Sequence, residues 1–235
     1  MYTTILWDLD NTLLSFNKAE KYAFDRCMTM AGLTPSDALL QCYDRINTAY
    51  WQMLERGEIT REVLLKQRFA TFFQEIGMNN VDVPLIRDTY QQLLGSVYYY
   101  MEGALELCTR LHQTHRQYIV TNGVASTQKS RLSLSHLDEL MDGCFISEEL
   151  GYEKPALAFF EKCFAQIPDL KKEETIIVGD SLTSDMQGGI GAGIACCWYN
   201  PDKKPIPAHM DISYSIQRLD ELLPIVSAPV ISSRA

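Results

Sequence analysis

Short runs of apolar residues alternate with amphipathic stretches along most of the chain. Five runs have the near-continuous apolar character of strands buried on both faces of a parallel sheet. They cover residues 4–7, 118–120, 144–146, 175–178 and 194–199. Helical periodicity follows over residues 103–114, 125–137, 155–166 and 183–191. The alternation predicts an α/β fold with a doubly wound, Rossmann-like parallel sheet built from right-handed βαβ units.

The interval between the first and second predicted strands has a different pattern. Apolar stripes at helical spacing follow one another there without a convincing strand. Ser36 and Thr60 are well placed as helix N-caps. A βαβ crossover needs only about a dozen residues, so this interval is predicted to be an inserted subdomain. The expected division is an α/β core of residues 1–16 and 99–222, a helical cap of residues 17–98, and a loosely ordered tail of residues 223–235.

Composition narrows the classes of partner. The net charge of −9 argues against a nucleic-acid polymer or an anionic membrane surface, because no basic excess exists to neutralise phosphates. No secretory signal pattern or apolar run of membrane-spanning length is evident. The seven cysteines are scattered and include no C-x-x-C pair, which favours reduced thiols in a cytoplasmic protein. We therefore expect a small-molecule partner, and the oligomeric state stays open.

Two acidic residues follow the first predicted strand. Asp8 and Asp10 stand two positions apart, and the period of a strand can place both carboxylates on one side of its carboxyl end. Ligand sites of open α/β sheets lie at that edge. Two close carboxylates repel each other, so they persist where a cation neutralises them or where one keeps a proton. A pair of solvated acids in a turn is the alternative for this pattern taken alone.

Polar residues also follow the next three predicted strands. They are Thr121, Asn122 and Gly123 after the second strand, Lys154 after the third, and Asp180 and Asp185 after the fourth. Taken singly, they could be a turn, a solvated surface charge and a helix N-cap. Together they place acids, a hydroxyl and an amine at one sheet edge, which suits a hard cation and a phosphoryl group. Magnesium commonly takes a couple of carboxylates and completes its shell with water and phosphate oxygens.

The four motifs, in this order, resemble those of the haloacid dehalogenase (HAD) superfamily. They read Asp-Leu-Asp-Asn-Thr from residue 8, Thr-Asn-Gly from 121, Lys-Pro from 154 and Gly-Asp-Ser-Leu-Thr-Ser-Asp from 179. The helical insert resembles the C1 cap of that superfamily, and the likeness spans about residues 3–222. More narrowly, residues 146–151, 188–193 and 197–200 are similar to the YjjG-type pyrimidine 5′-nucleotidases.

The resemblance implies a role for each acidic residue. Asp8 would attack phosphorus and become an aspartyl-phosphate, which splits hydrolysis into two easier steps. Asp10 would protonate the leaving oxygen and later take a proton from water. Magnesium would be bound by the Asp8 carboxylate, the Asp10 backbone carbonyl and Asp180. Asp185 would not bind the ion directly but would hold these ligands in place.

The remaining motif residues would bind the phosphoryl group. Thr121, Lys154 and the amides near Asn122 and Gly123 are implied to hold its oxygens, where catalysis is mainly positioning and charge stabilisation. The cap would close over the site, exclude water and read the leaving group.

Residues that read the leaving group are harder to choose from the sequence. Aromatic side chains of the insert could stack a base or could simply form its core: Tyr50, Trp51, Phe69 and Phe73. Arg131, in the helix after Thr-Asn-Gly, could contact the substrate or form a salt bridge.

The expected function is a magnesium-dependent phosphomonoesterase that prefers pyrimidine nucleoside 5′-monophosphates. A phosphatase of small sugar phosphates or phosphoglycolate and a phosphomutase are the nearest alternatives. A dehalogenase has no use for a second acid and a metal site, so Asp10 and Asp180 count against it. A phospho-accepting regulatory module shares the Asp, hydroxyl and Lys, but such modules are shorter and lack a long insert.

Overall fold

The computed structural model describes residues 1–228, and it divides into two compact units. The first contains Met1–Ser15 and the chain from Tyr99 onward, and the second is Phe16–Tyr98. Each unit is described by itself. Most of the tail prediction, residues 229–235, lies outside the described part of the chain.

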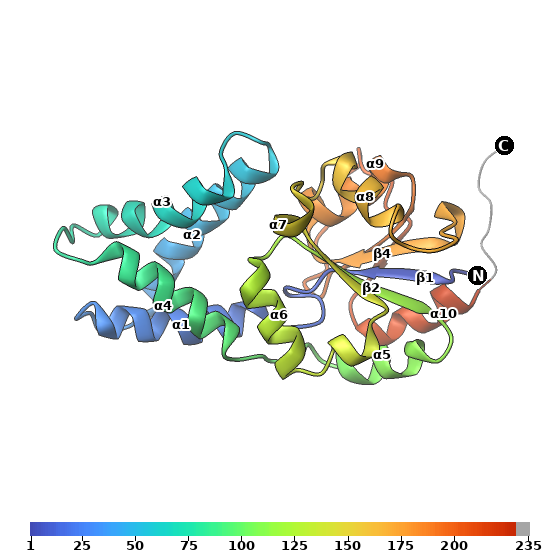
Figure 1. The fold of residues 1–235 in the computed structure, drawn as a ribbon, viewed down its shortest axis with the longest axis horizontal. Coiled ribbons are helices and arrows are strands. Elements are labelled where there is room, and N and C mark those ends of the chain that lie inside the picture. Colours follow the sequence, from blue (N-terminus) through green and yellow to red (C-terminus); the bar gives the residue numbers. More distant parts are fainter. Residues whose placement is uncertain (229–235) are drawn as a thin grey trace. The chain divides into compact units, whose positions relative to one another are not determined.

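The first unit is built on a parallel sheet. Its strands are β1 (Thr4–Trp7), β2 (Arg116–Thr121), β3 (Gly143–Ile146), β4 (Thr175–Gly179), β5 (Ala195–Tyr199) and β6 (Tyr214–Ile216). Within the described residues they form one six-stranded sheet in the order β3-β2-β1-β4-β5-β6, and every neighbouring pair is parallel (Figure 1). The doubly wound sheet predicted from the apolar runs is confirmed.

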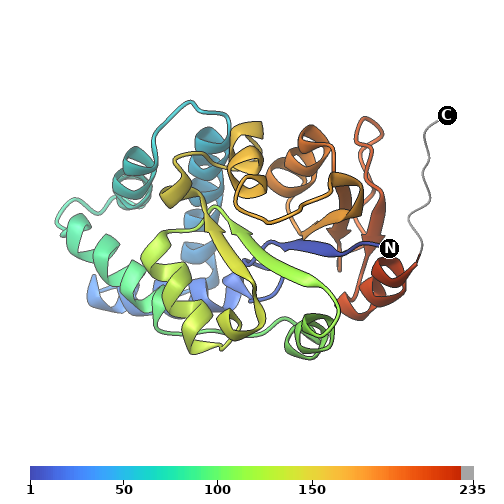
Figure 2. The ribbon, with the colours of Figure 1, turned by 45° about the vertical axis from the view of Figure 1, so that its right-hand side comes forward.

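Helices cover both faces of this sheet (Figure 2). They are α5 (Ala104–His112), α6 (Ala125–Leu134), α7 (Ser147–Leu150), α8 (Leu157–Phe164), α9 (Gln187–Ala192) and α10 (Leu222–Ser227). Side chains of α5, α6 and α10 pack in the core on one face, and those of α8 and α9 pack on the other. Alternation along β1 supplies both cores, because Ile5 and Trp7 face the first and Leu6 faces the second. Burial on both faces explains why β1, β4 and β5 are largely apolar.

The strand order positions the functional edge of the sheet. Chain progression from β1 runs outward through β2 and β3 on one side, and through β4, β5 and β6 on the other. The reversal therefore falls between β1 and β4, and ligand sites of such sheets lie outside the carboxyl ends of the strands at that point. Asp8 directly follows β1 and Asp180 directly follows β4, so both acids stand at the reversal.

The second unit is helical. Between residues 16 and 98 the helices are α1 (Phe16–Met30), α2 (Asp37–Glu55), α3 (Arg61–Glu75) and α4 (Val83–Gly95). Their apolar stripes meet in one core, in which α1 packs on α4 and α2 packs on α3. The predicted N-caps are present, because the Ser36 hydroxyl accepts from the amide of Leu39 and the Thr60 hydroxyl from that of Val63.

The chain leaves and re-enters the first unit at adjacent points. The amide of Ser15 donates to the carbonyl of Tyr99 at 2.7 Å, and Leu14 forms an antiparallel bridge with Tyr100. The two ends of the inserted segment are thus joined by backbone hydrogen bonds that belong to the α/β unit.

Three details differ from the sequence-based expectations. The short edge strand β6 was not predicted, and Pro155 precedes helix α8 instead of beginning it. The predicted tail from residue 223 begins as helix α10, in which Leu222 and Val226 are buried against the sheet. Four of the six residues of α10 are Leu, Ile or Val, which is enough for this short helix to pack on the sheet although its sequence has no helical periodicity. Within residues 1–228, no helix is long and apolar enough to cross a bilayer.

Candidate active site

Asp8 lies at the buried carboxyl end of β1. Its amide donates to the carbonyl of Val178 at 2.9 Å, so the backbone still belongs to the sheet where the side chain emerges. One carboxylate oxygen accepts from the Lys154 ammonium at 2.9 Å, and the other accepts from the Thr12 hydroxyl at 3.0 Å. Both oxygens are therefore held, which fixes the carboxylate at the sheet edge.

Lys154 is a buried ammonium surrounded by oxygen. Its Nζ donates to Asp8 at 2.9 Å, to Asp185 at 2.6 Å and to the carbonyl of Val120 at 2.7 Å. All three hydrogens of the ammonium thus have acceptors. The side chain is only 1% exposed, so the solvated surface charge that this lysine could have been is excluded.

Asp180 and Asp185 come from the segment after β4. The carbonyl of Asp180 accepts from the Trp198 indole at 2.9 Å, and Asp185 accepts from the amide of Ser181 at 3.1 Å. Gly179 allows this approach, because a Cβ at that position would lie 2.3 Å from an oxygen of Asp185. Asp185 is not a helix N-cap. That role belongs to Ser181, which begins a single π-helical turn over Leu182–Met186.

Burial and mutual repulsion shift the protonation of these groups. Burial raises the pKa of Asp8 to about 7, the charges of Asp185 and Asp10 add to the rise, and Lys154 opposes it. Burial also raises the pKa of Asp180 well above its usual value, with the charges of Asp8 and Asp185 contributing. Burial alone would lower the pKa of Lys154, but the carboxylates of Asp185 and Asp8 hold it above its ordinary value. More negative charge gathers here than one lysine balances.

The same acids form a set of oxygen donors suited to a divalent cation. Asp8, Asp180 and Asp185 each offer a carboxylate oxygen, and these oxygens lie within 4.8 Å of one another. Hard oxygen donors in this number fit magnesium better than a softer metal. The excess negative charge also fits, because a bound cation would offset both the burial and the mutual repulsion that raise the pKa values of Asp8 and Asp180.

Asp10 is held by a second group of side chains. One of its oxygens forms an ion pair with Arg131, and the other accepts from the Gln128 amide at 2.7 Å. The same Gln128 nitrogen lies 2.8 Å from the hydroxyl of Thr121, which also accepts from the amide of Gly123 at 3.1 Å. Asp10 and Thr121 are thus linked through one glutamine.

The side chain of Asn122 contacts the backbone of another loop. Its amide makes two hydrogen bonds to the backbone of Lys154, one donated and one accepted. Asn122 therefore positions the lysine, while contact of its backbone amide with a phosphate stays a prediction. Gln128 was not identified from the sequence. The available signal was that Gln128 and Arg131 fall on the buried face of α6.

The aromatic residues of the inserted unit divide into two groups. Phe69 and Phe73 are buried in its core, where Phe69 stacks on Tyr43 with ring centroids 4.7 Å apart. The hydroxyl of Tyr50 lies 2.9 Å from the hydroxyl of Thr71, and the ring centroid of Trp51 lies 5.7 Å from the guanidinium carbon of Arg61. Both residues are partly exposed.

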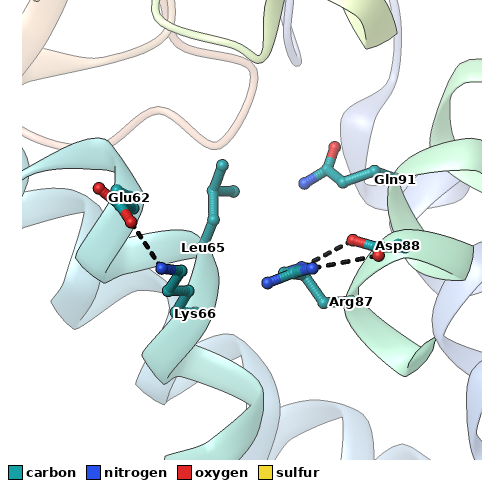
Figure 3. Close-up of a pocket in the computed structure, with 6 residues that line it drawn as sticks. All are labelled: Glu62, Leu65, Lys66, Arg87, Asp88 and Gln91. Atoms are coloured by element: carbon teal, nitrogen blue, oxygen red, sulfur yellow. Dashed lines mark hydrogen bonds and ion pairs between the residues drawn. The ribbon is translucent and has the colours of Figure 1, made fainter. Parts of the chain in front are cut away.

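A small pocket of about 180 Å³ also lies between α3 and α4 (Figure 3). Its lining residues are Glu62, Leu65, Lys66, Arg87, Asp88 and Gln91. Lys66 donates to Glu62 at 2.5 Å and Arg87 to Asp88 at 2.7 Å, so the cations of this pocket already face carboxylates. None of the predicted site residues belongs to it.

The doubly wound sheet and the acidic, lysine-containing centre at its carboxyl edge define an α/β enzyme. The chain belongs to the haloacid dehalogenase-like hydrolases, whose family pattern matches residues 5–199. The superfamily resemblance seen in the motifs is therefore confirmed.

Several curated relatives match nearly the whole chain, among them the following three. The HAD-hydrolase YfnB of Bacillus subtilis is 36% identical and covers 96% of each chain. The pyrimidine 5′-nucleotidase PynA of Streptococcus pneumoniae is 34% identical and covers 94% of each chain. The pyrimidine 5′-nucleotidase YjjG of Escherichia coli is 28% identical over 93% of this chain and 95% of its own.

A solved structure agrees closely with the fold. The crystal structure of YfnB from Bacillus subtilis, bound to magnesium, superposes with a TM-score of 0.91 over 97% of this chain and 99% of that chain, at 36% identity. Interdomain movement is described for that protein.

Proposed function

We propose that the protein is a magnesium-dependent phosphomonoesterase that works through an aspartyl-phosphate on Asp8. The observation that carries the proposal is the setting of Asp8, a buried carboxylate held by Lys154 and grouped with Asp180 and Asp185. Covalent catalysis of phosphate transfer needs a fixed nucleophile, a counter-charge for the phosphoryl oxygens and a neutralised acidic site. The membership of the chain in a hydrolase family supports this reading.

Magnesium would be held by the Asp8 carboxylate, the backbone carbonyl of Asp10 and Asp180. Asp185 would hold the surrounding residues in place without binding the ion directly, since its oxygens already accept from Lys154 and the amide of Ser181. When bound, the cation supplies charge neutralisation between the acids and the phosphoryl oxygens. The magnesium-bound structure of YfnB supports this assignment.

Asp8 attacks phosphorus while the bond from phosphorus to the ester oxygen breaks. Asp10 gives a proton to the departing oxygen, and it later takes one from the water that cleaves the aspartyl-phosphate. The Thr121 hydroxyl donates to the phosphoryl oxygens, and Lys154 attracts them by its charge, since its three hydrogens already have acceptors. Burial of Lys154 strengthens its attraction for a phosphate, because little water competes with it.

Pyrimidine nucleoside 5′-monophosphates are the proposed substrates. PynA and YjjG, both named for that activity, match this chain over almost all of its length. We assign residues 16–98 the part of a cap that reads the leaving group. The partly exposed rings of Tyr50 and Trp51 are its candidates for stacking on a base. With a pyrimidine bound, the cap would close more fully over Asp8 than with the larger purine. The preference for pyrimidines would therefore appear in kcat/KM as well as in binding.

A panel of phosphate esters tests this assignment. Phosphate release is measured with saturating magnesium on dUMP, dTMP, dAMP, dGMP and phosphoglycolate. The expected result is a graded preference for dUMP and dTMP, since contacts to one base give about 1–3 kcal/mol. Equal or higher kcat/KM for purines or phosphoglycolate would reject the pyrimidine assignment alone. No release from any ester would reject the phosphatase.

Charge and cysteine chemistry support proposals about the partner and the location of the protein. The partner is a small phosphate ester, and the net charge of −9 gives no support for binding a nucleic-acid polymer. All seven cysteines, each within the described residues, are free thiols. These thiols support the proposal of a cytoplasmic location, where cysteines are kept reduced.

A further inference from the structure

Helix α6 turns a polar pair toward the interior. Gln128 and Arg131 stand three positions apart on one face of the helix, and their exposed fractions are 1% and 0%. A core helix ordinarily places apolar side chains at such positions. The exception therefore needs a reason beyond packing.

The pair grips both oxygens of Asp10. Arg131 pairs with one oxygen, and Gln128 donates to the other at 2.7 Å. Arg131 also donates to the carbonyl oxygen of Gln128 at 3.0 Å, which orients the glutamine amide. The Gln128 nitrogen lies 2.8 Å from the Thr121 hydroxyl as well, so the position of Asp10 is tied to that of Thr121.

This arrangement is poorly suited to stabilising the fold. Within the described residues, Nε and one terminal nitrogen of Arg131 are buried without a hydrogen-bond partner. Its ion-pair partner Asp10 stays 27% exposed, so solvent weakens the attraction that offsets burial of the guanidinium. A buried ion pair with unsatisfied donors is often no more stable than an apolar replacement of similar volume.

We propose that Arg131 and Gln128 are positioning residues that hold the Asp10 carboxyl at the leaving-group oxygen. This inference rests on the role of Asp10 proposed above. In the first step, the bond from Asp8 to phosphorus forms and the bond from phosphorus to the ester oxygen breaks. The electron pair stays on that oxygen, and the proton of Asp10 in its carboxylic acid form moves to it. The carboxylate left behind is the form that pairs with Arg131. A proton donor acts only within hydrogen-bond reach, so a free rotamer of Asp10 would lose the transfer.

Leaving-group dependence separates this role from a structural one. Arg131→Met is compared with the wild type by kcat/KM on dUMP, whose alkoxide needs a proton, and on p-nitrophenyl phosphate, whose phenolate does not. The expected loss is about 100-fold on dUMP and small on p-nitrophenyl phosphate. Lys129→Met, an exposed residue of the same helix, is the matched control and should change neither value.

Asp10→Asn isolates the inference from the proposed function. If Asp10→Asn loses activity on dUMP selectively, the acid role of Asp10 stands, and the Arg131→Met/Asp10→Asn double variant should lose little more. Equal losses on both esters in Arg131→Met, or a gain on dUMP, would overturn the positioning role. Absence of selectivity in Asp10→Asn itself would overturn the proposed role of Asp10. Should Arg131→Met fail to fold, Arg131→Lys gives the same comparison; Gln128→Leu does not, because Gln128 also holds the Thr121 hydroxyl and its loss would lower kcat/KM on both esters.

Discussion

Asn122 and Lys154 are joined by two hydrogen bonds that run in opposite directions. The side-chain carbonyl of Asn122 accepts from the Lys154 amide at 2.8 Å, and its NH₂ donates to the Lys154 carbonyl at 2.9 Å. The clamp fixes the backbone from which the buried ammonium reaches Asp8. The loops that follow β2 and β3 are thereby joined at the lysine that contacts the candidate nucleophile.

Asn122→Ala should reduce kcat/KM by about 10- to 100-fold, because a small displacement of a catalytic group has effects of that size. Asn200 supplies a matched control, since it clamps the backbone of Lys204 with bonds of 2.8 and 2.9 Å. Asn200→Ala removes the same pair of bonds outside the proposed site. Steady-state kinetics on dUMP should show the loss in the first variant only. Similar losses in both would mean that the clamp at Lys154 has only a general structural effect.

Asp8→Asn should reduce kcat by at least about 100-fold. The amide nearly matches the carboxylate in shape but is a poor nucleophile. The melting temperature should not fall, because the substitution removes a buried acid whose pKa is raised first by burial and then by the neighbouring carboxylates. Calorimetry and phosphate release on the same preparation check both points. A variant that kept a tenth of the wild-type kcat would show that another residue attacks phosphorus.

Asp180→Ala should raise the magnesium concentration needed for half-maximal rate by at least about tenfold. The backbone should stay in place, since the Trp198 indole holds the Asp180 carbonyl instead of its side chain. Asp202→Ala, at an exposed acid, is the control. The measurement is initial rate against magnesium concentration after metal removal. Undiminished turnover of the wild type in excess EDTA would contradict the metal site.

The helical unit should lose stability as pH rises. Burial first, and then the charge of Asp44, raise the pKa of Glu20 to about 8 from 4.5, against the opposing effects of Tyr90 and Arg68. The folded chain therefore keeps a proton that the unfolded chain has released. The free energy of unfolding should fall between pH 4.5 and about 8, by about 1.4 kcal/mol for each pKa unit of the shift.

Glu20→Gln should remove that slope while keeping a neutral group beside Asn47 and Tyr90. Urea unfolding at several pH values across the window measures it. Glu62→Gln, at an exposed glutamate paired with Lys66, should leave the slope unchanged. An identical pH dependence in the wild type and Glu20→Gln would show that Glu20 is ionised in the folded chain.

The sequence predicted the fold well because its buried strands have an unambiguous pattern. Residues 4–7 match β1 without a shift, because the apolar run ends abruptly at the charged Asp8. The edge strand Tyr214–Ile216 was missed because it is three residues long and only one of them is fully buried. Such a strand exists through its pairing with β5, which no local pattern records.

The candidate site was predictable in membership and less so in its contacts. Strand ends indicated that Asp8, Lys154 and Asp180 converge, because parallel strands deliver their last residues to one edge. Spacing could not show that the Asn122 side chain faces the backbone of another loop. Nor could it decide whether Arg131 contacts the substrate or forms a salt bridge, because the sequence does not show which groups face its side chain. The structure shows an ion pair with Asp10, and contact of Arg131 with the substrate stays a prediction.

The bond between Ser15 and Tyr99 makes the enzyme modular. An insertion whose ends already meet imposes no separation on the strands that carry the chemistry, so the length and content of residues 16–98 can vary while the sheet keeps its register. The part of the chain assigned to reading substrates can therefore diverge without disturbing the part that cleaves them. The same junction is a suitable place for protein engineering, because the native segment of residues 16–98 could be replaced there by another helical segment.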